Sequence, residues 1–210
     1  MMGVESMENN EGMLLLFSGP SGVGKDTVLE LIFEKNKNLQ RSISLTTREQ
    51  RQNEIDGVDY HFVSKDTFMK LVDEKKVLEF AEYGQNYYGT PKGPVDKWLS
   101  EGKVVILKIE VQGAQKIRQI YPDAISIFLM PPSMEELESR IRNRGTEDEK
   151  GIRERLNIAH QEIKRCVDYD YIVVNEDSNK ACDDVLDIIK VLNFTYKRMN
   201  NYISEVIKNV

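Results

Sequence analysis

The chain has 210 residues, of which 40% are hydrophobic and 30% charged, a balance typical of one soluble α/β domain with small additions. Its 35 acidic and 29 basic residues give a formal net charge of −6, which excludes a general electrostatic attraction to nucleic acid or to anionic membranes. No apolar run approaches the roughly 20 residues that span a bilayer, and the polar segment 1–12 predicts a loose tail without a secretory signal. We therefore expect a cytoplasmic protein.

The first apolar run, Met13–Ser18, predicts a buried strand that ends at Gly19. A glycine-rich turn follows, and apolar residues at helical spacing predict a helix over 27–35. Three further apolar runs predict strands at 103–111, 125–130 and 171–174. Helical segments separate these runs, and one of them opens with the capping box Ser133-x-x-Glu136. This alternation predicts a parallel sheet with right-handed crossovers.

The segment from about 44 to 98 has a more mixed pattern, which predicts an insertion with a small sheet of its own. Within it, Ser64 predicts the cap of a helix over 66–75. From Ser178 onward the pattern is helical to near the end of the chain. The apolar stripe of this last segment predicts packing on the core, and its length also permits pairing with a partner helix. The stripe consists of Val185, Ile189, Leu192, Tyr196, Met199, Ile203 and Val206.

A phosphate-binding loop is predicted directly after the first strand. The sequence GPSGVGK, from Gly19 to Lys25, matches G-x-x-x-x-G-K between a strand and a helix, the context that this pattern requires. Glycines let the backbone turn its N–H groups inward, while the helix N-terminus and Lys25 add positive charge. The predicted polyphosphate-binding residues are Gly19, Pro20, Ser21, Gly22, Val23, Gly24, Lys25, Asp26 and Thr27.

Asp26 departs from the usual loop, in which a Ser or Thr after the lysine offers its hydroxyl to Mg²⁺. Two alternatives follow. Either Thr27 serves the phosphates while water completes the metal shell, or Asp26 approaches the metal through water. The sequence assigns no metal ligand.

Several later motifs narrow the acceptor. SISLTTREQR begins at Ser42, and DGVDYHFVS, VLEFAEY and NYYGTP follow in that order. From about Met13 to Asn175 this series resembles guanylate kinases. The resemblance implies an α/β P-loop three-layer fold with a central parallel sheet, an inserted small mixed α/β GMP-binding subdomain and a helical lid. It implies a core of 13–43, 102–139 and 168–210, a monophosphate-binding subdomain of 44–101 and a lid of 140–167.

The resemblance also implies individual roles. Arg48 and Arg51 match the pair that grips the GMP phosphate, and two guanidinium groups suit that dianion. Glu79 matches a guanine reader, since a carboxylate can accept from N1–H and N2–H of guanine, whereas adenine has a lone pair at N1 and no N2 amine. Tyr87 is expected to pack only. The implied GMP-binding residues are Ser44, Arg48, Arg51, Tyr60, Glu79, Tyr88, Gly89, Thr90 and Glu110.

An arginine-rich segment, 140–155, resembles the lid of the family. The implied catalytic residues are Lys25, Arg48, Arg140, Arg144 and Arg155, and Asn175 is implied as an ATP-binding residue of the adenine pocket. Arg142 and Arg153 are expected to face solvent. The alternative is a basic helix face paired with the acidic residues at 147–149, because pairing between residues i and i+4 is common on helices.

Lys108 is a second departure, because the family usually carries an acid at this position. Strand alternation puts Lys108 and Glu110 on one face. The lysine reverses the charge near the metal, and we hypothesise that it pairs with Asp26.

The resemblance therefore implies an ATP:GMP phosphotransferase of purine metabolism that uses Mg²⁺. Its partners are ATP and GMP, with no nucleic acid and no membrane, and it is a monomer or a homodimer with the C-terminal helix as the candidate contact. One alternative is a non-catalytic or catalytically weak guanylate-kinase-like binding module, for which Asp26 and Lys108 are the only support. Another is a P-loop kinase for a different small phosphate ester, which would have no use for Ser44, Glu79 and Thr90.

Overall fold

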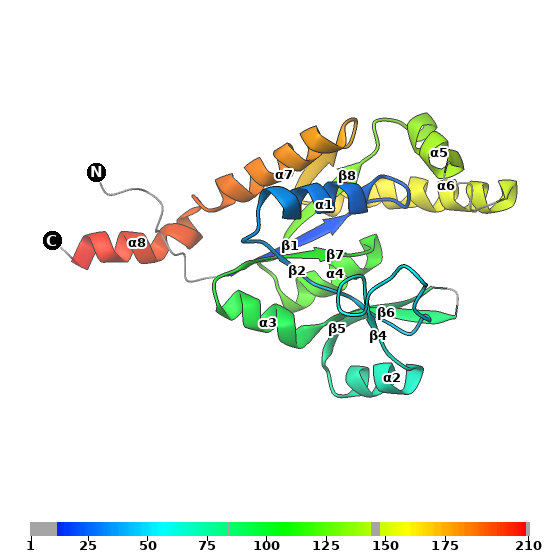
Figure 1. Cartoon of the computed structure of the whole chain (residues 1–210). Coiled ribbons are helices and arrows are strands. Elements are labelled where there is room, and N and C mark those ends of the chain that lie inside the picture. The colour runs from blue at the N-terminus through cyan, green and yellow to red at the C-terminus, as the bar shows by residue number, and fades with distance from the viewer. Residues whose placement is uncertain (1–11, 84, 144–147, 209–210) are drawn as a thin grey trace.

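The computed structural model describes residues 12–83, 85–143 and 148–208, so nearly all of the expected N-terminal tail lies outside it. Its central sheet has five parallel strands in the order β2-β7-β1-β8-β9 (Figure 1). The strands are β1 (Met13–Ser18), β2 (Gln40–Arg41), β7 (Val104–Lys108), β8 (Ile125–Met130) and β9 (Tyr171–Val174). The four predicted strands are present, but the one expected over 103–111 ends at Lys108, so Glu110 precedes α4 and is not on the strand. Strand β2 is an addition whose two polar residues carry no periodic signal.

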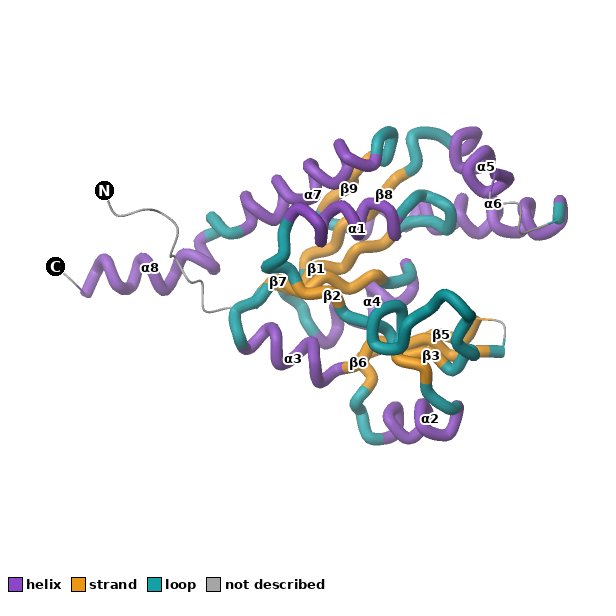
Figure 2. Tube along the Cα trace, in the orientation of Figure 1, coloured by secondary structure: helices purple, strands orange, loops and turns teal. Residues whose placement is uncertain are grey.

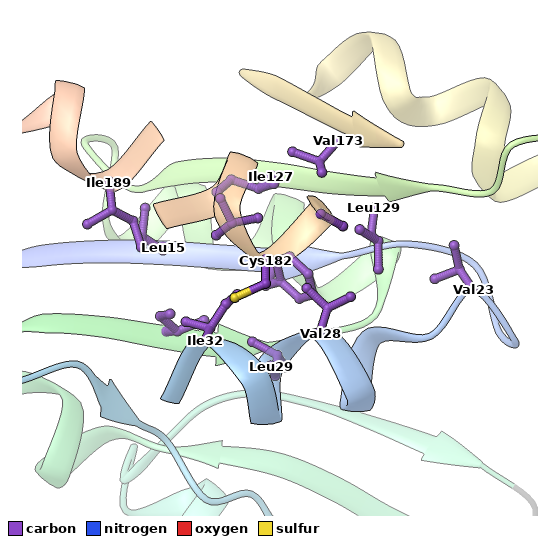
Figure 3. Close-up of a cluster of buried hydrophobic side chains, with 14 of the residues drawn as sticks. Leu15, Val23, Val28, Leu29, Ile32, Ile127, Leu129, Val173, Cys182 and Ile189 are labelled. Carbon is purple, nitrogen blue, oxygen red and sulfur yellow. The ribbon is translucent and has the colours of Figure 1, made fainter. Parts of the chain in front are cut away.

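One face of the central sheet is covered by α1 (Lys25–Lys35) and α7 (Ser178–Leu192) (Figure 2). Alternation along β1 sends Leu15 and Phe17 to this side. Figure 3 shows how side chains of the sheet and of both helices interlock there. The buried residues of this layer include Val28, Leu29, Ile32, Ile127, Leu129, Val173, Cys182 and Ile189.

The opposite face is covered by α3 (Lys92–Ser100) and α4 (Val111–Ile120) (Figure 2). Leu14 and Leu16 of β1 point to this side, where they meet Val95 and Ile117 of the two helices. The molecule is therefore a three-layer α/β fold, as predicted.

The insertion forms a second sheet with the order β4-β3-β6-β5, in which β3 and β4 are parallel and the other neighbours antiparallel. Its strands are β3 (Leu45–Thr46), β4 (His61–Phe62), β5 (Val77–Tyr83) and β6 (Asn86–Pro91). Helix α2 (Lys65–Asp73) packs on this sheet, where Phe68 stacks on Tyr87 with ring centroids 5.6 Å apart. The predicted cap is confirmed, because Ser64 Oγ accepts from Thr67 N–H at 3.1 Å.

Two helices, α5 (Met134–Asn143) and α6 (Glu149–Lys164), lie above the C-terminal end of the central sheet, and a short 3₁₀ turn at Arg165–Asp168 follows (Figure 1). The Ser133 part of the capping box is confirmed, since Ser133 Oγ accepts from Glu136 N–H at 3.1 Å.

The C-terminal helical pattern is interrupted between Leu192 and Tyr196, where α7 ends and α8 (Tyr196–Lys208) begins. Val185, Ile189 and Leu192 of the predicted stripe are buried, whereas Tyr196 is 76% exposed. Figure 1 shows α8 directed away from the central sheet. The prediction that the stripe packs on the core is therefore correct for α7 and wrong for α8. Within the described ranges, the helices are all too short or too polar to cross a membrane.

Candidate functional site

Three stretches of the predicted site begin at the C-terminal edge of the central sheet. Gly19 follows β1, Glu110 lies two residues after β7, and Asn175 follows β9. Asn175 N–H continues the ladder by donating to Met130 O at 2.8 Å. Ligands of α/β sheets bind in the crevice outside this edge, because the loops that leave it are free to carry function.

The loop after β1 is shaped by three glycines. Gly19, Gly22 and Gly24 have φ values of 151°, 90° and 98°, in the region that disfavours side chains. A Cβ atom at Gly19 would lie 2.4 Å from Leu129 O, and one at Gly24 would lie 2.7 Å from Asn175 Nδ2. The loop therefore needs glycine both for its turn and for its close contact with neighbouring strands.

Lys25 closes this loop from inside. Its ammonium group donates to Gly19 O at 2.5 Å and to Pro20 O at 3.0 Å. Burial lowers the pKa of Lys25, and the carboxylates of Glu110 and Glu162 oppose that shift. The lysine is thus held among the loop carbonyls with two carboxylates near it.

Asp26 and Lys108, the two residues that depart from the usual sequence pattern, are in direct contact. Lys108 Nζ donates to Asp26 Oδ1 at 2.7 Å, which confirms the hypothesis that they pair. Burial alone would raise the pKa of Asp26, but Lys108 outweighs it and the pKa lies below its ordinary value. The Asp26 side chain remains 64% exposed, so one carboxylate can meet both the lysine and solvent.

Asn175 and Arg140 fasten α5 and β9 to the phosphate-binding loop. Asn175 is 2% exposed, and its Nδ2 donates to Val23 O at 2.7 Å. Arg140 donates to Val23 O at 3.3 Å and to Asn175 O at 3.0 Å. Its Nε also donates to Glu136 Oε1 at 2.8 Å, one turn earlier on α5. Arg140 is therefore oriented toward the loop rather than toward open solvent.

The other arginines of the segment predicted to form a lid differ from Arg140. Arg142 forms ion pairs with Glu138 and Glu149. For this arginine, the alternative that a basic helix face pairs with nearby acidic residues is therefore correct. Arg155 is half-buried on α6. Arg144, which is also predicted to be catalytic, falls outside the described residues.

Arg48 is held by a carboxylate that the sequence did not single out. Its Nη2 donates to Glu54 Oε1 at 2.7 Å and its Nη1 to Glu54 Oε2 at 3.0 Å. Its guanidinium carbon lies 5.6 Å from the Tyr60 ring centroid and 5.8 Å from that of Phe62. Tyr60 contacts Tyr88 edge-on at 5.9 Å between centroids, so the three predicted residues Arg48, Tyr60 and Tyr88 form one cluster.

Glu79 and Thr90 form a second polar pair in the insertion. Thr90 is 3% exposed, and its Oγ1 donates to Glu79 Oε1 at 2.8 Å. Burial raises the pKa of Glu79, although the hydroxyl of Thr90 and the charge of Lys116 oppose the shift. The antiparallel register of Leu45 with Gly89 sets Ser44 beside Thr90. The structure thus brings together the three residues predicted to read guanine.

Glu110 connects the two halves of the site. Its charge acts on Lys25 in the phosphate-binding loop and on Glu79 in the insertion. Among the described residues, no group of three or more His, Cys, Asp or Glu side chains is placed to hold a metal ion.

Two acidic residues of the site escaped the sequence reasoning. Glu54 lies six residues after Arg48, a spacing that carries no signal in a segment without helix or strand. Glu162 lies near the end of α6, and burial raises its pKa while Lys25 lowers it. Only the folded chain brings Glu162 to the loop, so its sequence position gave no indication of this contact.

The comparisons with known proteins agree with this geometry. The family model for guanylate kinase matches residues 11–192. A guanylate kinase of Oceanobacillus iheyensis is 43% identical over 97% of this chain and 98% of that protein, and one of Enterococcus faecalis is 47% identical over 91% and 94%. The crystal structure of guanylate kinase from Anaplasma phagocytophilum superposes with a TM-score of 0.72 at 34% identity, covering 90% of each chain. The chain belongs to the guanylate kinase family.

Proposed function

We propose that this protein transfers the γ-phosphoryl group of ATP to GMP, giving ADP and GDP. The observation that carries the proposal is that the chain has two cation-bearing clusters. Lys25 lies within the glycine loop, and Arg48 lies in the insertion, which also holds the Glu79–Thr90 pair. The charge of Glu110 acts both on Lys25 and on Glu79. The two relatives described above are guanylate kinases, and this chain matches them over nearly their whole length, which supports the same activity here.

On the donor side, the loop from Gly19 to Thr27 would bind the ATP phosphates. Its backbone N–H groups and the N-terminus of α1 favour anions, and Lys25 adds a full charge. When a phosphate arrives, Lys25 Nζ can exchange its bonds with Gly19 O and Pro20 O for phosphate oxygens. Asn175 and Arg140, both bonded to Val23 O, hold the loop in place for this contact.

On the acceptor side, Arg48, Arg51, Tyr60 and Tyr88 would bind the GMP phosphate. Glu79 would accept from N1–H and N2–H of guanine, and its bond from Thr90 fixes the carboxylate for that task. The remaining proposed contacts are Ser44, Gly89 and Glu110. The reaction needs no covalent nucleophile from the protein, because an oxygen of the GMP phosphate attacks the γ-phosphorus in line.

Negative charge on the transferring group would be stabilised by Lys25 and by the lid arginines Arg140, Arg144 and Arg155. Arginines suit this task because their planar N–H donors match phosphate oxygens. Arg140 already lies at the loop, held by Glu136 and Asn175 O. Closure of α5 and α6 over both nucleotides would exclude water from the reacting phosphates.

Mg²⁺ is the proposed cofactor. In such sites the ion keeps several waters and binds substrate phosphates with the help of one or two carboxylates. The residues near Lys25 fit this mode, because Asp26 and Glu110 are both carboxylates and Asp26 is half open to solvent. When bound, the ion would neutralise charge on the β- and γ-phosphates.

One assay tests the proposal. Purified protein is given ATP and Mg²⁺ with GMP, AMP, CMP or UMP, and ADP release is followed by a coupled reaction. We expect GMP to be used far better than the other three. Equal use of AMP, or no ADP release with any of them, would contradict the proposal.

A further inference from the structure

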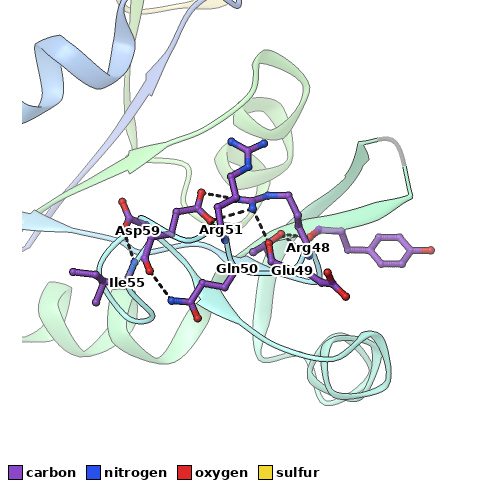
Figure 4. Close-up of polar contacts among 9 residues, drawn as sticks. Arg48, Glu49, Gln50, Arg51, Ile55 and Asp59 are labelled. Atoms are coloured by element: carbon purple, nitrogen blue, oxygen red, sulfur yellow. Dashed lines mark hydrogen bonds and ion pairs between the residues drawn. The ribbon is translucent and has the colours of Figure 1, made fainter. Parts of the chain in front are cut away.

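Glu54 is a carboxylate on the acceptor side that has no role in the function proposed above. Its carboxylate accepts two bonds from Arg48 and a third, at 2.9 Å, from Arg51 N–H. The side chains of Arg48 and Glu54 are each only 17% exposed. One carboxylate thus binds both arginines of the segment, one through its side chain and one through its backbone. Figure 4 shows Arg48, Gln50 and Arg51 among the polar contacts of this segment.

We propose that Glu54 is a positioning residue for Arg48 and Arg51, which holds the turn 48–54 in the shape that binds the acceptor phosphate. This inference rests on the proposed GMP kinase activity and adds to it the group that orients the phosphate-binding arginines. Gln50 closes the same turn, because its Nε2 donates to Glu54 O at 2.5 Å.

The donor count of Arg48 shows that Glu54 need not compete with the substrate. A guanidinium has five N–H donors. Nη1 donates to Glu54 and, at 2.7 Å, to Glu49 O, while Nη2 donates once to Glu54. The other two donors, Nε–H and the second Nη2 hydrogen, lie on the guanidinium edge that Glu54 does not use, and the side chain of Tyr88 also hydrogen-bonds to Arg48. These two donors point in parallel along one edge, the geometry that grips a phosphate.

The packing around Arg48 supports the same role. Tyr60 and Phe62 lie against the guanidinium, and Tyr88 interacts with it. A hydrogen bond with Arg48 lowers the pKa of Glu54, and the N–H of Arg51 adds to the shift. Glu54 therefore stays ionised at neutral pH and keeps Arg48 in one rotamer. A pre-oriented arginine loses less side-chain entropy when the phosphate binds.

The test compares Glu54→Gln with Glu49→Gln. Both substitutions remove one negative charge from the same turn, but the Glu49 side chain is exposed and only its backbone oxygen contacts Arg48. For Glu54→Gln we expect the KM for GMP to rise about tenfold or more, because the bonds lost are charge-assisted. The KM for ATP should stay within about twofold, and Glu49→Gln should resemble wild type.

A binding measurement distinguishes a specific loss of phosphate binding from a general loss of structure in the acceptor site. Titration calorimetry of GMP and of guanosine should show a large loss of GMP affinity in Glu54→Gln and little change for guanosine. Glu54→Asp keeps the charge on a shorter stem and should lie between wild type and Glu54→Gln. It also serves as the test if the glutamine variant does not fold.

Three results would overturn the inference. They are an unchanged GMP KM in both Glu54 variants, an equal loss of GMP and guanosine affinity, and a tighter GMP affinity, which would identify Glu54 as a competitor of the phosphate. A wild-type protein that does not phosphorylate GMP would instead refute the proposed function, so the two failures are distinguishable.

Discussion

The Glu79→Gln substitution tests how the protein selects its base. The change replaces one carboxylate oxygen by an amide NH₂ and removes the charge. In the structure Thr90 already occupies Oε1 of Glu79 at 2.8 Å, so a bound guanine must use the remaining acceptor positions. The amide would present either a donor to guanine N–H groups or a donor to the Thr90 hydroxyl.

The expected cost follows from the hydrogen bonds. Bonds to charged groups contribute about 1.5–3 kcal/mol, and about 1.4 kcal/mol is tenfold in affinity. Losing one such bond should raise the KM for GMP about ten- to hundredfold. The KM for ATP should not change, because Glu79 lies in the insertion and not in the phosphate-binding loop.

Stability provides the control for this variant. Burial raises the pKa of Glu79 above its unfolded value. The folded state therefore binds more protons between the two pKa values, and the free energy of unfolding falls as pH rises through that window. Glutamine does not ionise, so the ligand-free variant should be at least as stable as wild type at neutral pH.

The assay is ADP release with varied GMP, read beside thermal unfolding of the ligand-free protein. The KM of wild type for GMP should also rise as pH falls, because protonation of Glu79 removes a hydrogen-bond acceptor. This rise should begin at a higher pH than for an ordinary glutamate, since the pKa of Glu79 is raised. Glu79→Gln should lack this pH dependence. An unchanged GMP KM in a folded variant would show that Glu79 does not read guanine.

Three other experiments address the donor side. Lys25→Ala should lower kcat by about a hundredfold or more while thermal unfolding shows a folded protein, since burial already opposes its charge; a kcat near wild type would contradict the assignment. For the Asp26–Lys108 pair, a double-mutant cycle on the free energy of unfolding should give a coupling energy of about 0–1 kcal/mol, because an exposed pair is screened by solvent. This coupling energy should be present above the unfolded-state pKa of Asp26 and should be lost as pH falls through its lowered folded-state pKa. Gly24→Ala should destabilise by roughly 1–3 kcal/mol and raise the KM for ATP, since its Cβ would lie 2.7 Å from Asn175 Nδ2; a wild-type melting temperature would refute that reasoning.

The elements that the sequence predicted are those whose signal is local. The strand Met13–Ser18 and the cap at Ser64 follow from apolar runs and from one hydroxyl at the right spacing. The pairing of Asp26 with Lys108 was also open to sequence reasoning, because two unusual charges stood beside one predicted metal position.

The features that were missed depend on tertiary contacts. Two residues of β2 gain their strand form only by pairing with β7. The division of the C-terminal helix after Leu192 carries no glycine or proline to mark it, and Thr195 Oγ1 donates to Leu192 O there instead. Glu54 and Glu162 were missed because an acidic residue in a loop or on a helix face is ordinarily a solvated charge.

The charges of the site explain how an acidic chain can bind phosphates. Arg48 is held by Glu54, Arg140 by Glu136, and Lys108 by Asp26. A carboxylate that fixes a cation lowers the local positive potential but also removes the entropy cost of ordering a long side chain, about 0.5–1.5 kcal/mol for each one. If the saving in ordering entropy outweighs the loss of positive potential, removing such a carboxylate should weaken binding of the substrate anion even though the net charge of the protein becomes less negative.

Glu136→Gln separates the two effects, with Glu138→Gln as its matched control. Both residues lie on α5 and each pairs with an arginine four residues later, but Arg140 also donates to Val23 O and Asn175 O, whereas Arg142 pairs with Glu149. We expect Glu136→Gln to raise the KM for ATP about two- to fivefold, the scale of one exposed ion pair, and Glu138→Gln to leave it unchanged. A general field would instead lower that KM equally in both variants, with the gain lost at high salt. Tighter ATP use in Glu136→Gln at low ionic strength would therefore show that net charge, and not orientation of Arg140, governs the donor site.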